Sequence, residues 1–172
     1  HGAGNREGVV TFVLDGKGYK VSIKVEQYDY EYGDNDVIIN QTHRIGDGVN
    51  IVFMGDCFDA KDISEGKYLD AMNEAIGYFF DVEPYKTYRD YFNVYTVFGL
   101  SPDSGIGTVN TIRESRFGTQ YTLTEGLCPD RDACFEGACY APINNNVAQT
   151  LIVMIENSDA YAGVTYMWGD GS

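Results

Sequence analysis

The chain has 172 residues, of which 44% are hydrophobic and 14% aromatic. This length and composition suit one large or two small globular domains with a buried core, and they argue against disorder. A formal net charge of −14 opposes binding to nucleic-acid phosphate, and no basic cluster offsets it. No apolar run approaches the ~20 residues that span a bilayer, so we expect no membrane span.

The N-terminal part of the chain is predicted to be β-rich. Residues 5–27 have β-forming flanks around a glycine-rich turn, which predicts a hairpin. An isolated hairpin is marginal in water, so this one must pack on something else or belong to a larger sheet. Residues 28–36 are polar and turn-prone, a candidate linker, and residues 37–45 form another extended segment. We assign residues 1–45 to this N-terminal segment and 46–172 to a second domain.

Three short apolar runs predict the strands of a covered sheet, at residues 49–56, 92–100 and 150–156. Between the first two, apolar residues recur every three or four positions and predict a helix over about residues 62–81, which Pro84 ends. Strand, crossover helix and strand form a βαβ unit, which we expect to be right-handed. The predicted fold class is therefore α/β (mixed α+β), with a central mixed sheet and a crossover helix.

The segments between these strands are predicted from their composition. Residues 101–119 are rich in Gly, Ser, Thr and Asp and predict a long surface loop, of a length that is usually functional or mobile. Residues 120–127 predict a short strand, and residues 144–149 a short helix.

Four cysteines, Cys57, Cys128, Cys134 and Cys139, bear on compartment and metal binding. Three of them lie in a predicted loop at residues 128–139, whose spacings contain no Cys-x-x-Cys and no nearby histidine, so zinc binding there is disfavoured. A disulfide-stapled loop in an exported protein is favoured, and the pairing stays open. A buried, unpaired Cys57 is the alternative.

No complete catalytic constellation is visible in the residues themselves. The two histidines, His1 and His43, form no metal-spaced pair, and we interpret His43 as structural. Asp56 ends a strand where a phosphate loop or metal ligand could lie, but glycine and lysine signals are missing, so a turn or helix-cap role is favoured. Acidic residues in the predicted turns could bind calcium, yet solvated carboxylates are the simpler interpretation; they are Asp29, Asp34, Asp36, Asp130 and Asp132.

Several ordered segments together resemble the IgA-peptidase-type family of zinc metallopeptidases. They are residues 46–56 (GDGVNIVFMGD), 79–85 (FFDVEPY), 88–95 (YRDYFNVY), 101–105 (SPDSG) and 157–163 (NSDAYAG). The resemblance implies the upper, sheet-containing subdomain of a zincin. Residues 5–27 resemble the last hairpin of an Ig-like sandwich module of the BACON type, which often precedes secreted or surface enzymes. We accordingly expect a secreted, periplasmic or cell-surface protein.

The resemblance implies a fragment without its metal site. Family members bind zinc with a His-Glu-x-x-His helix and a third ligand, and residues 1–172 contain no such motif. We expect no catalytic residue and no bound cofactor in this chain, zinc in the full-length protein, and two partners: a peptide or protein substrate and the missing C-terminal half. An edge strand of such a sheet aligns substrate, which makes Gly163, Val164, Tyr166 and Trp168 the candidate substrate-binding residues, with 101–107 a second rim.

Two other functions stay open. An extracellular α/β binding or adhesion module without chemistry could recognise protein or glycan through its 14 tyrosines. A doubly wound nucleotide-binding domain is a poorer match, because no phosphate-binding glycines or lysine follow the first strand. A His-Glu-x-x-His helix encoded beyond residue 172 would favour the peptidase over both.

Overall fold

The computed structural model describes residues 6–13, 20–28, 31–108, 110–122, 126–144 and 146–158. The chain divides into two compact units, residues 1–31 and residues 32–172. Residues 32–45, which the sequence assigned to the N-terminal segment, lie in the second unit because a strand within them pairs with its sheet. Within the described residues, no helix is both long and apolar enough to cross a membrane.

The first unit contains the predicted hairpin. Strands β1 (Arg6–Val13) and β2 (Lys20–Gln27) pair antiparallel along their whole length, with Val10 opposite Ile23. Because side chains alternate across a strand, five apolar residues gather on one face, and no described residue of this unit covers them, while Val9 (68% exposed) lies on the other face. The exposed set is Val10 (46%), Phe12 (58%), Val21 (60%), Ile23 (51%) and Val25 (46%).

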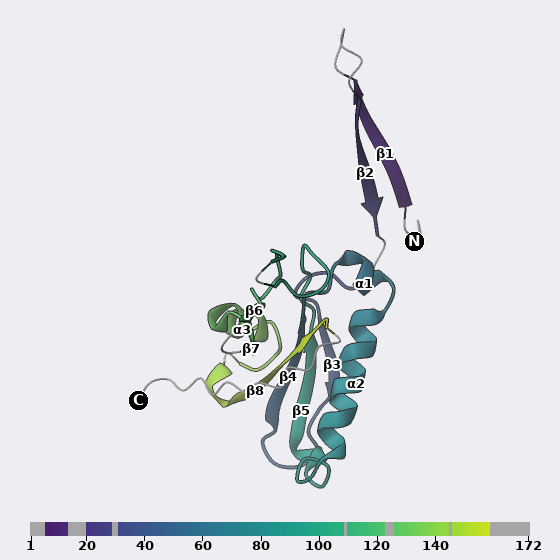
Figure 1. The fold of residues 1–172 in the computed structure, drawn as a ribbon. Helices are drawn as coiled ribbons and strands as arrows, with labels where there is room; N and C mark the ends of the chain where they lie inside the picture. The colour runs from purple at the N-terminus through teal and green to yellow at the C-terminus, as the bar shows by residue number, and fades with distance from the viewer. Residues whose placement is uncertain are drawn as a thin grey trace. The chain divides into compact units, whose positions relative to one another are not determined.

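The second unit is built on a four-stranded mixed sheet, so the predicted fold class is confirmed. The strand order is β3 (Val37–Gln41), β5 (Phe92–Val97), β4 (Val49–Asp56), β8 (Thr150–Glu156). Strands β5 and β8 run parallel to β4, and β3 runs antiparallel to β5. Figure 1 shows α2 along one side of this sheet and α3 on the other.

Strand β4 is buried on both faces, which explains its continuous apolar run. Ile51 and Phe53 face α2, where the Phe53 ring meets the Phe79 ring edge-on at 6.0 Å. Val52 and Met54 point the other way, into a core completed by the chain around α3. All four side chains are no more than 1% exposed. A centre strand of a parallel sheet needs apolar residues at every position for this reason.

The predicted single helix over 62–81 is instead two helices, and the prediction was wrong at this point. Helix α1 spans Ala60–Ser64 and begins at Asp59, whose carboxylate accepts a hydrogen bond from the Asp62 amide at 2.9 Å. Helix α2 spans Lys67–Asp81. Gly66 separates them with φ of 81°, a left-handed conformation that glycine adopts without strain.

The prediction of a loop at residues 128–139 was also wrong. It contains β7 (Gly126–Cys128), paired with β6 (Gln120–Thr122), and helix α3 (Arg131–Ala138). All four cysteines are free, so the structure does not contain the expected disulfide, and Cys134 is a core residue with no exposed surface. Two short 3-10 helices, Arg89–Tyr91 and Val147–Gln149, precede β5 and β8.

Tyr68 fastens α2 to the sheet through its hydroxyl group. The hydroxyl donates to the Val97 carbonyl at 2.6 Å and accepts from the amides of Gly55 at 2.7 Å and Gly99 at 3.1 Å. A Cβ atom at Gly55 would lie 2.6 Å from the Tyr68 ring, so glycine is required there. Three backbone groups at the ends of β4 and β5 thus depend on one fully buried phenol.

Replacing Tyr68 by Phe keeps the ring and leaves those three buried backbone groups without their partner. We expect Tyr68→Phe to lower the free energy of unfolding by about 1–3 kcal/mol, measured by urea denaturation. The control is Tyr78→Phe, which removes an exposed hydroxyl from the same helix and should change stability by less than about 0.5 kcal/mol. Equal effects of the two variants would contradict this role.

Candidate functional site

The candidate site lies at the edge of the sheet where the parallel strands end. The chain leaves β4 through α2 to reach β5, and it leaves β5 through α3, on the other side of the sheet, to reach β8. The connections thus leave the carboxyl ends of the neighbouring strands β4 and β5 on opposite sides of the sheet, an arrangement at which ligands bind in open α/β sheets. Asp56 and Glu156 pair in register at this position. Both predicted strands ended in an acidic residue, a signal that could have placed these carboxyl groups together.

Asp56 is a fully buried carboxylate with five hydrogen-bond donors. Its Oδ1 accepts from the Cys57 amide at 2.8 Å and from the Ser101 hydroxyl at 2.9 Å. The other donors come from the chain at 115–119: they are the Ser115 hydroxyl at 2.8 Å, the Thr119 amide at 3.1 Å and the Phe117 amide at 3.2 Å. An ionised carboxylate has about four lone-pair sites, so these donors use its full accepting capacity. Of the predicted turn or helix-cap role, the helix cap is wrong, since Asp59 begins α1.

The predicted surface loop at 101–119 is therefore fixed at both its ends to the strand edge. Ser101 is 2% exposed, Phe117 0% and Thr119 1%, which the polar composition of this segment did not indicate. The Ser101 hydroxyl also accepts from the amides of Cys57 and Arg116, both at 3.0 Å. The loop has little regular backbone pairing, and the Asp56 carboxylate accepts hydrogen bonds from backbone amides that would otherwise lack a partner.

A second carboxylate, Asp62, holds the same loop at Ser104, close to its start. It accepts from the Ser104 hydroxyl at 2.6 Å and from the Asn157 amide group at 2.9 Å, and Lys67 lies 3.5 Å away. Asn157, directly after β8, also donates to the Cys57 carbonyl at 3.0 Å. Helix α1, the loop and the end of β8 are joined in one polar network.

Glu156 lies beside Asp56 at this edge and is largely buried. Burial and the nearby charge of Asp56 raise the pKa of Glu156 to about 8. The Thr119 hydroxyl donates to it at 3.1 Å, and the Cys57 thiol lies 3.9 Å away. Burial, with Asp56 and Glu156 beside it, likewise raises the pKa of the Cys57 thiol. Cys57 is therefore a neutral thiol, unsuited to act as a nucleophile.

Asp56, Cys57 and Glu156 bring ligand atoms within 4.8 Å of one another, the spacing of a metal site. Their chemistry does not fit zinc. The oxygens of Asp56 already accept from five donors, which leaves them no lone pair for a metal ion, and no histidine stands beside the cluster among the described residues. We assign this cluster to anchoring the loop.

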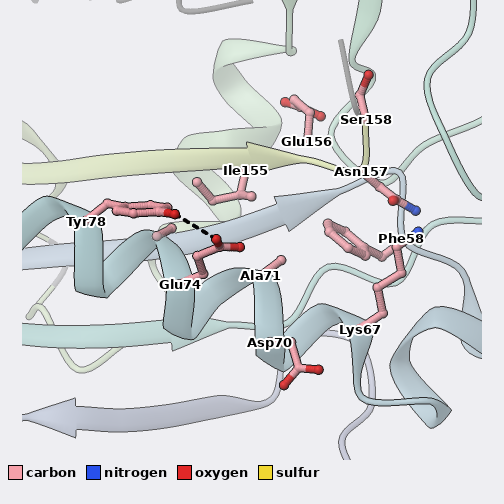
Figure 2. A pocket seen from close by; sticks show the side chains of 11 residues that line it. Phe58, Lys67, Asp70, Ala71, Glu74, Tyr78, Ile155, Glu156, Asn157 and Ser158 are labelled. Atoms are coloured by element: carbon pink, nitrogen blue, oxygen red, sulfur yellow. Dashed lines mark hydrogen bonds between the residues drawn. The ribbon is translucent and has the colours of Figure 1, made fainter. Parts of the chain in front are cut away.

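A groove of about 520 Å³ lies on the other side of the β8 terminus, beside α2. Figure 2 shows that Ala71 and Tyr78 of α2 face Ile155 across it, while the Glu156 side chain points away. The Tyr78 hydroxyl donates to Glu74 at 3.0 Å. The groove is apolar at its base and acidic at its α2 rim.

The sequence-predicted site residues fall into three groups. The substrate-binding candidates Gly163, Val164, Tyr166 and Trp168 lie outside the described residues. In the rim candidate at 101–107, the Ser101 hydroxyl donates to Asp56 at the end of β4, at 2.9 Å. The Nδ1 atom of His43 lies 2.8 Å from the Asn93 side-chain oxygen, and its structural role stays a prediction.

The acidic residues weighed as calcium ligands have other partners wherever they are described. Asp34 contacts Arg116 at 3.3 Å, Asp36 accepts from the Gly33 amide at 2.7 Å, and Asp130 begins α3. Asp132 pairs with Arg131 at 2.9 Å, and Asp29 lies outside the described residues.

Comparison with protein families gives one match. The family model of IgA Peptidase M64 matches residues 37–168, from the first residue of β3 to beyond the end of β8. The matched region covers the whole described sheet of the second unit. No curated protein matches the chain.

Replacing Asp56 by Asn removes the charge and presents an amide group to donors that need acceptors. We expect Asp56→Asn to lower the free energy of unfolding by about 2–4 kcal/mol and to expose Arg113 and Arg116 to trypsin. Urea denaturation and timed proteolysis measure the two effects. The control Asp132→Asn, at an exposed carboxylate, should leave both unchanged; native resistance to trypsin in Asp56→Asn would contradict the anchoring role.

The raised pKa of Glu156 predicts an unusual dependence of the free energy of unfolding on pH. The carboxyl titrates near 4.5 when unfolded and near 8 when folded, so between these values the unfolded chain releases a proton that the folded chain keeps. Stability should therefore fall as pH rises from about 4.5 to 8, by on the order of a few kcal/mol. Denaturation midpoints across this range measure it. Glu156→Gln should flatten the slope, and an unchanged slope in that variant would refute the assignment.

Proposed function

This chain belongs to the IgA Peptidase M64 family, and on that premise we propose that it is the sheet-containing N-terminal part of a zinc peptidase. The observation that carries the proposal is the family match, which spans β3 to β8 and the network at their ends. Peptide-bond hydrolysis in the full-length protein is the proposed reaction, and a peptide or protein is its substrate.

The role of this part is to align the substrate. The far edge of β8 pairs with no other described strand, and an extended peptide can add to a sheet through main-chain hydrogen bonds. We keep Gly163, Val164, Tyr166 and Trp168 as proposed substrate contacts, since they follow β8 closely in the chain. The anchored loop at 101–119 shapes the neighbouring rim.

Zinc is proposed to be bound by the C-terminal half of the protein rather than by residues 1–172. The chain holds two histidines and no His-Glu-x-x-His, and the Asp56 cluster does not fit the metal. When bound, zinc supplies a Lewis acid that activates water for hydrolysis. The residues described here supply the rigid sheet against which substrate is held.

The first unit is proposed to be the last hairpin of a BACON-type sandwich. Its support is the exposed apolar face of β1 and β2, which in a sandwich would pack on a second sheet. A secreted, periplasmic or cell-surface location follows from that resemblance.

A binding or adhesion module is the second candidate function. The observation that favours it is a set of exposed tyrosines on and after α2: Tyr78 (67%), Tyr85 (36%), Tyr88 (53%) and Tyr91 (39%). Tyrosine offers large contact area at low entropic cost. Under this alternative the natural protein would bind its partner without hydrolysing it.

The proposal predicts different behaviour for this chain and for the protein extended along its natural reading frame. The extended protein should bind one zinc ion and cleave a denatured protein substrate, and a chelator should abolish the cleavage. Residues 1–172 alone should do neither. Metal analysis and a peptide-release assay on both proteins provide the measurement, and stoichiometric zinc on the short chain would overturn the assignment.

A further inference from the structure

The side-chain amide of Asn157 joins the end of β8 to three other parts of the second unit. Figure 2 shows Asn157 where β8 ends. Its Nδ2 atom donates to three oxygens: the Cys57 carbonyl at 3.0 Å, the Asp62 carboxylate at 2.9 Å and the Ser104 hydroxyl at 3.1 Å. These oxygens belong to the chain directly after β4, to α1 and to the loop that follows β5.

The surroundings of this side chain require a hydrogen-bond donor. A carbonyl and a carboxylate only accept, and the Ser104 hydroxyl donates its own proton to Asp62 at 2.6 Å. An amide group carries two N–H bonds and can serve these oxygens from one half-buried position. A carboxylate of the same shape at position 157 would instead place a second negative charge against Asp62. The three acceptors therefore explain why the residue is asparagine.

The same contacts fix the rim at 101–107 relative to the end of β8. The Cys57 carbonyl accepts from Asn157 and also from the backbone amide of Gly105, at 2.8 Å. Ser104, the neighbour of Gly105, contacts Asn157 through its hydroxyl. The other end of the loop is held separately, because its donors at 115–119 bind Asp56. Two consecutive rim residues thus meet the strand end at one point, and Asn157 is at its centre.

We propose that Asn157 is a positioning residue for substrate binding, which holds the rim at Ser104 and Gly105 at a fixed distance from the edge of β8. The proposal rests on the proposed function, in which a peptide lies along that edge. A peptide that pairs with a strand is held in one register, and a rim displaced by about 1 Å no longer matches it. Asn157 acts through the rim and touches no reacting atom, so its loss should change substrate affinity and leave the chemical step intact.

Hydrogen exchange on residues 1–172 measures whether the rim depends on Asn157. Asn157→Asp keeps the shape of the side chain and turns its donor into an acceptor, and Asn157→Ala removes the donor without adding charge. In both variants we expect the Gly105 amide to exchange at least about tenfold faster, while the amides of Phe53 in β4 and of Thr119 keep their wild-type rates. The control Asn73→Asp makes the same chemical change at an exposed position of α2 and should alter none of these rates.

Steady-state kinetics of the extended protein measure whether the rim serves the substrate. Rates are divided by the bound zinc, so that a smaller folded fraction does not change them. We expect Asn157→Asp and Asn157→Ala to raise KM for a peptide substrate about three- to tenfold at an unchanged kcat, and Asn73→Asp to change neither. A merely structural role would lower the amount of active protein and leave KM as it is.

The outcomes separate the positioning role from the peptidase assignment. Zinc-dependent cleavage with an unchanged KM in both Asn157 variants overturns the positioning role alone. An unchanged exchange rate of the Gly105 amide also overturns it, whatever the kinetics show, because the rim would then not depend on Asn157. A wild-type extended protein that cleaves no peptide overturns the peptidase assignment, and with it the role of Asn157 in binding substrate.

Discussion

The second unit depends on the buried carboxylate of Asp56. Burying an ionised group is costly unless its hydrogen-bonding capacity is filled, and five donors fill it here. Three of the donors come from the chain at 115–119, which has little backbone pairing of its own. The same hydrogen bonds therefore stabilise the end of β4 and fix the position of the loop. Loss of the Asp56 carboxylate is expected to disrupt both.

The two faces of the sheet differ at this edge. On the α3 side of the sheet, the described carboxyl groups, the Cys57 thiol and the hydroxyl groups hydrogen-bond to one another. On the α2 side, apolar and acidic side chains remain uncovered in the described residues. For a chain of the IgA Peptidase M64 family, the two faces of the sheet therefore differ in character at the ends of β4 and β8.

Sequence periodicity was sufficient for the sheet, because a strand covered on both faces leaves an unbroken apolar run, as at 49–56. It failed where a single backbone position decides the outcome: Gly66 splits the predicted helix through its left-handed conformation. The sequence interpretation failed again at residues 128–139, where the three cysteines suggested a disulfide-linked loop. Cys134 is instead a core residue. The Asp56 network was beyond pattern reasoning, since its donors are 1 to 63 positions away and are recruited by tertiary contact.

Native-state hydrogen exchange of the amides that donate to Asp56 tests the central claim most directly. The amides of Phe117 and Thr119 belong to a segment that resembles a loop in composition, yet the account predicts that they exchange as slowly as those of β4, through global unfolding alone. Exchange of these two amides at the rate of an unprotected loop, with β4 still protected, would show that the carboxylate does not hold the segment and would contradict the account.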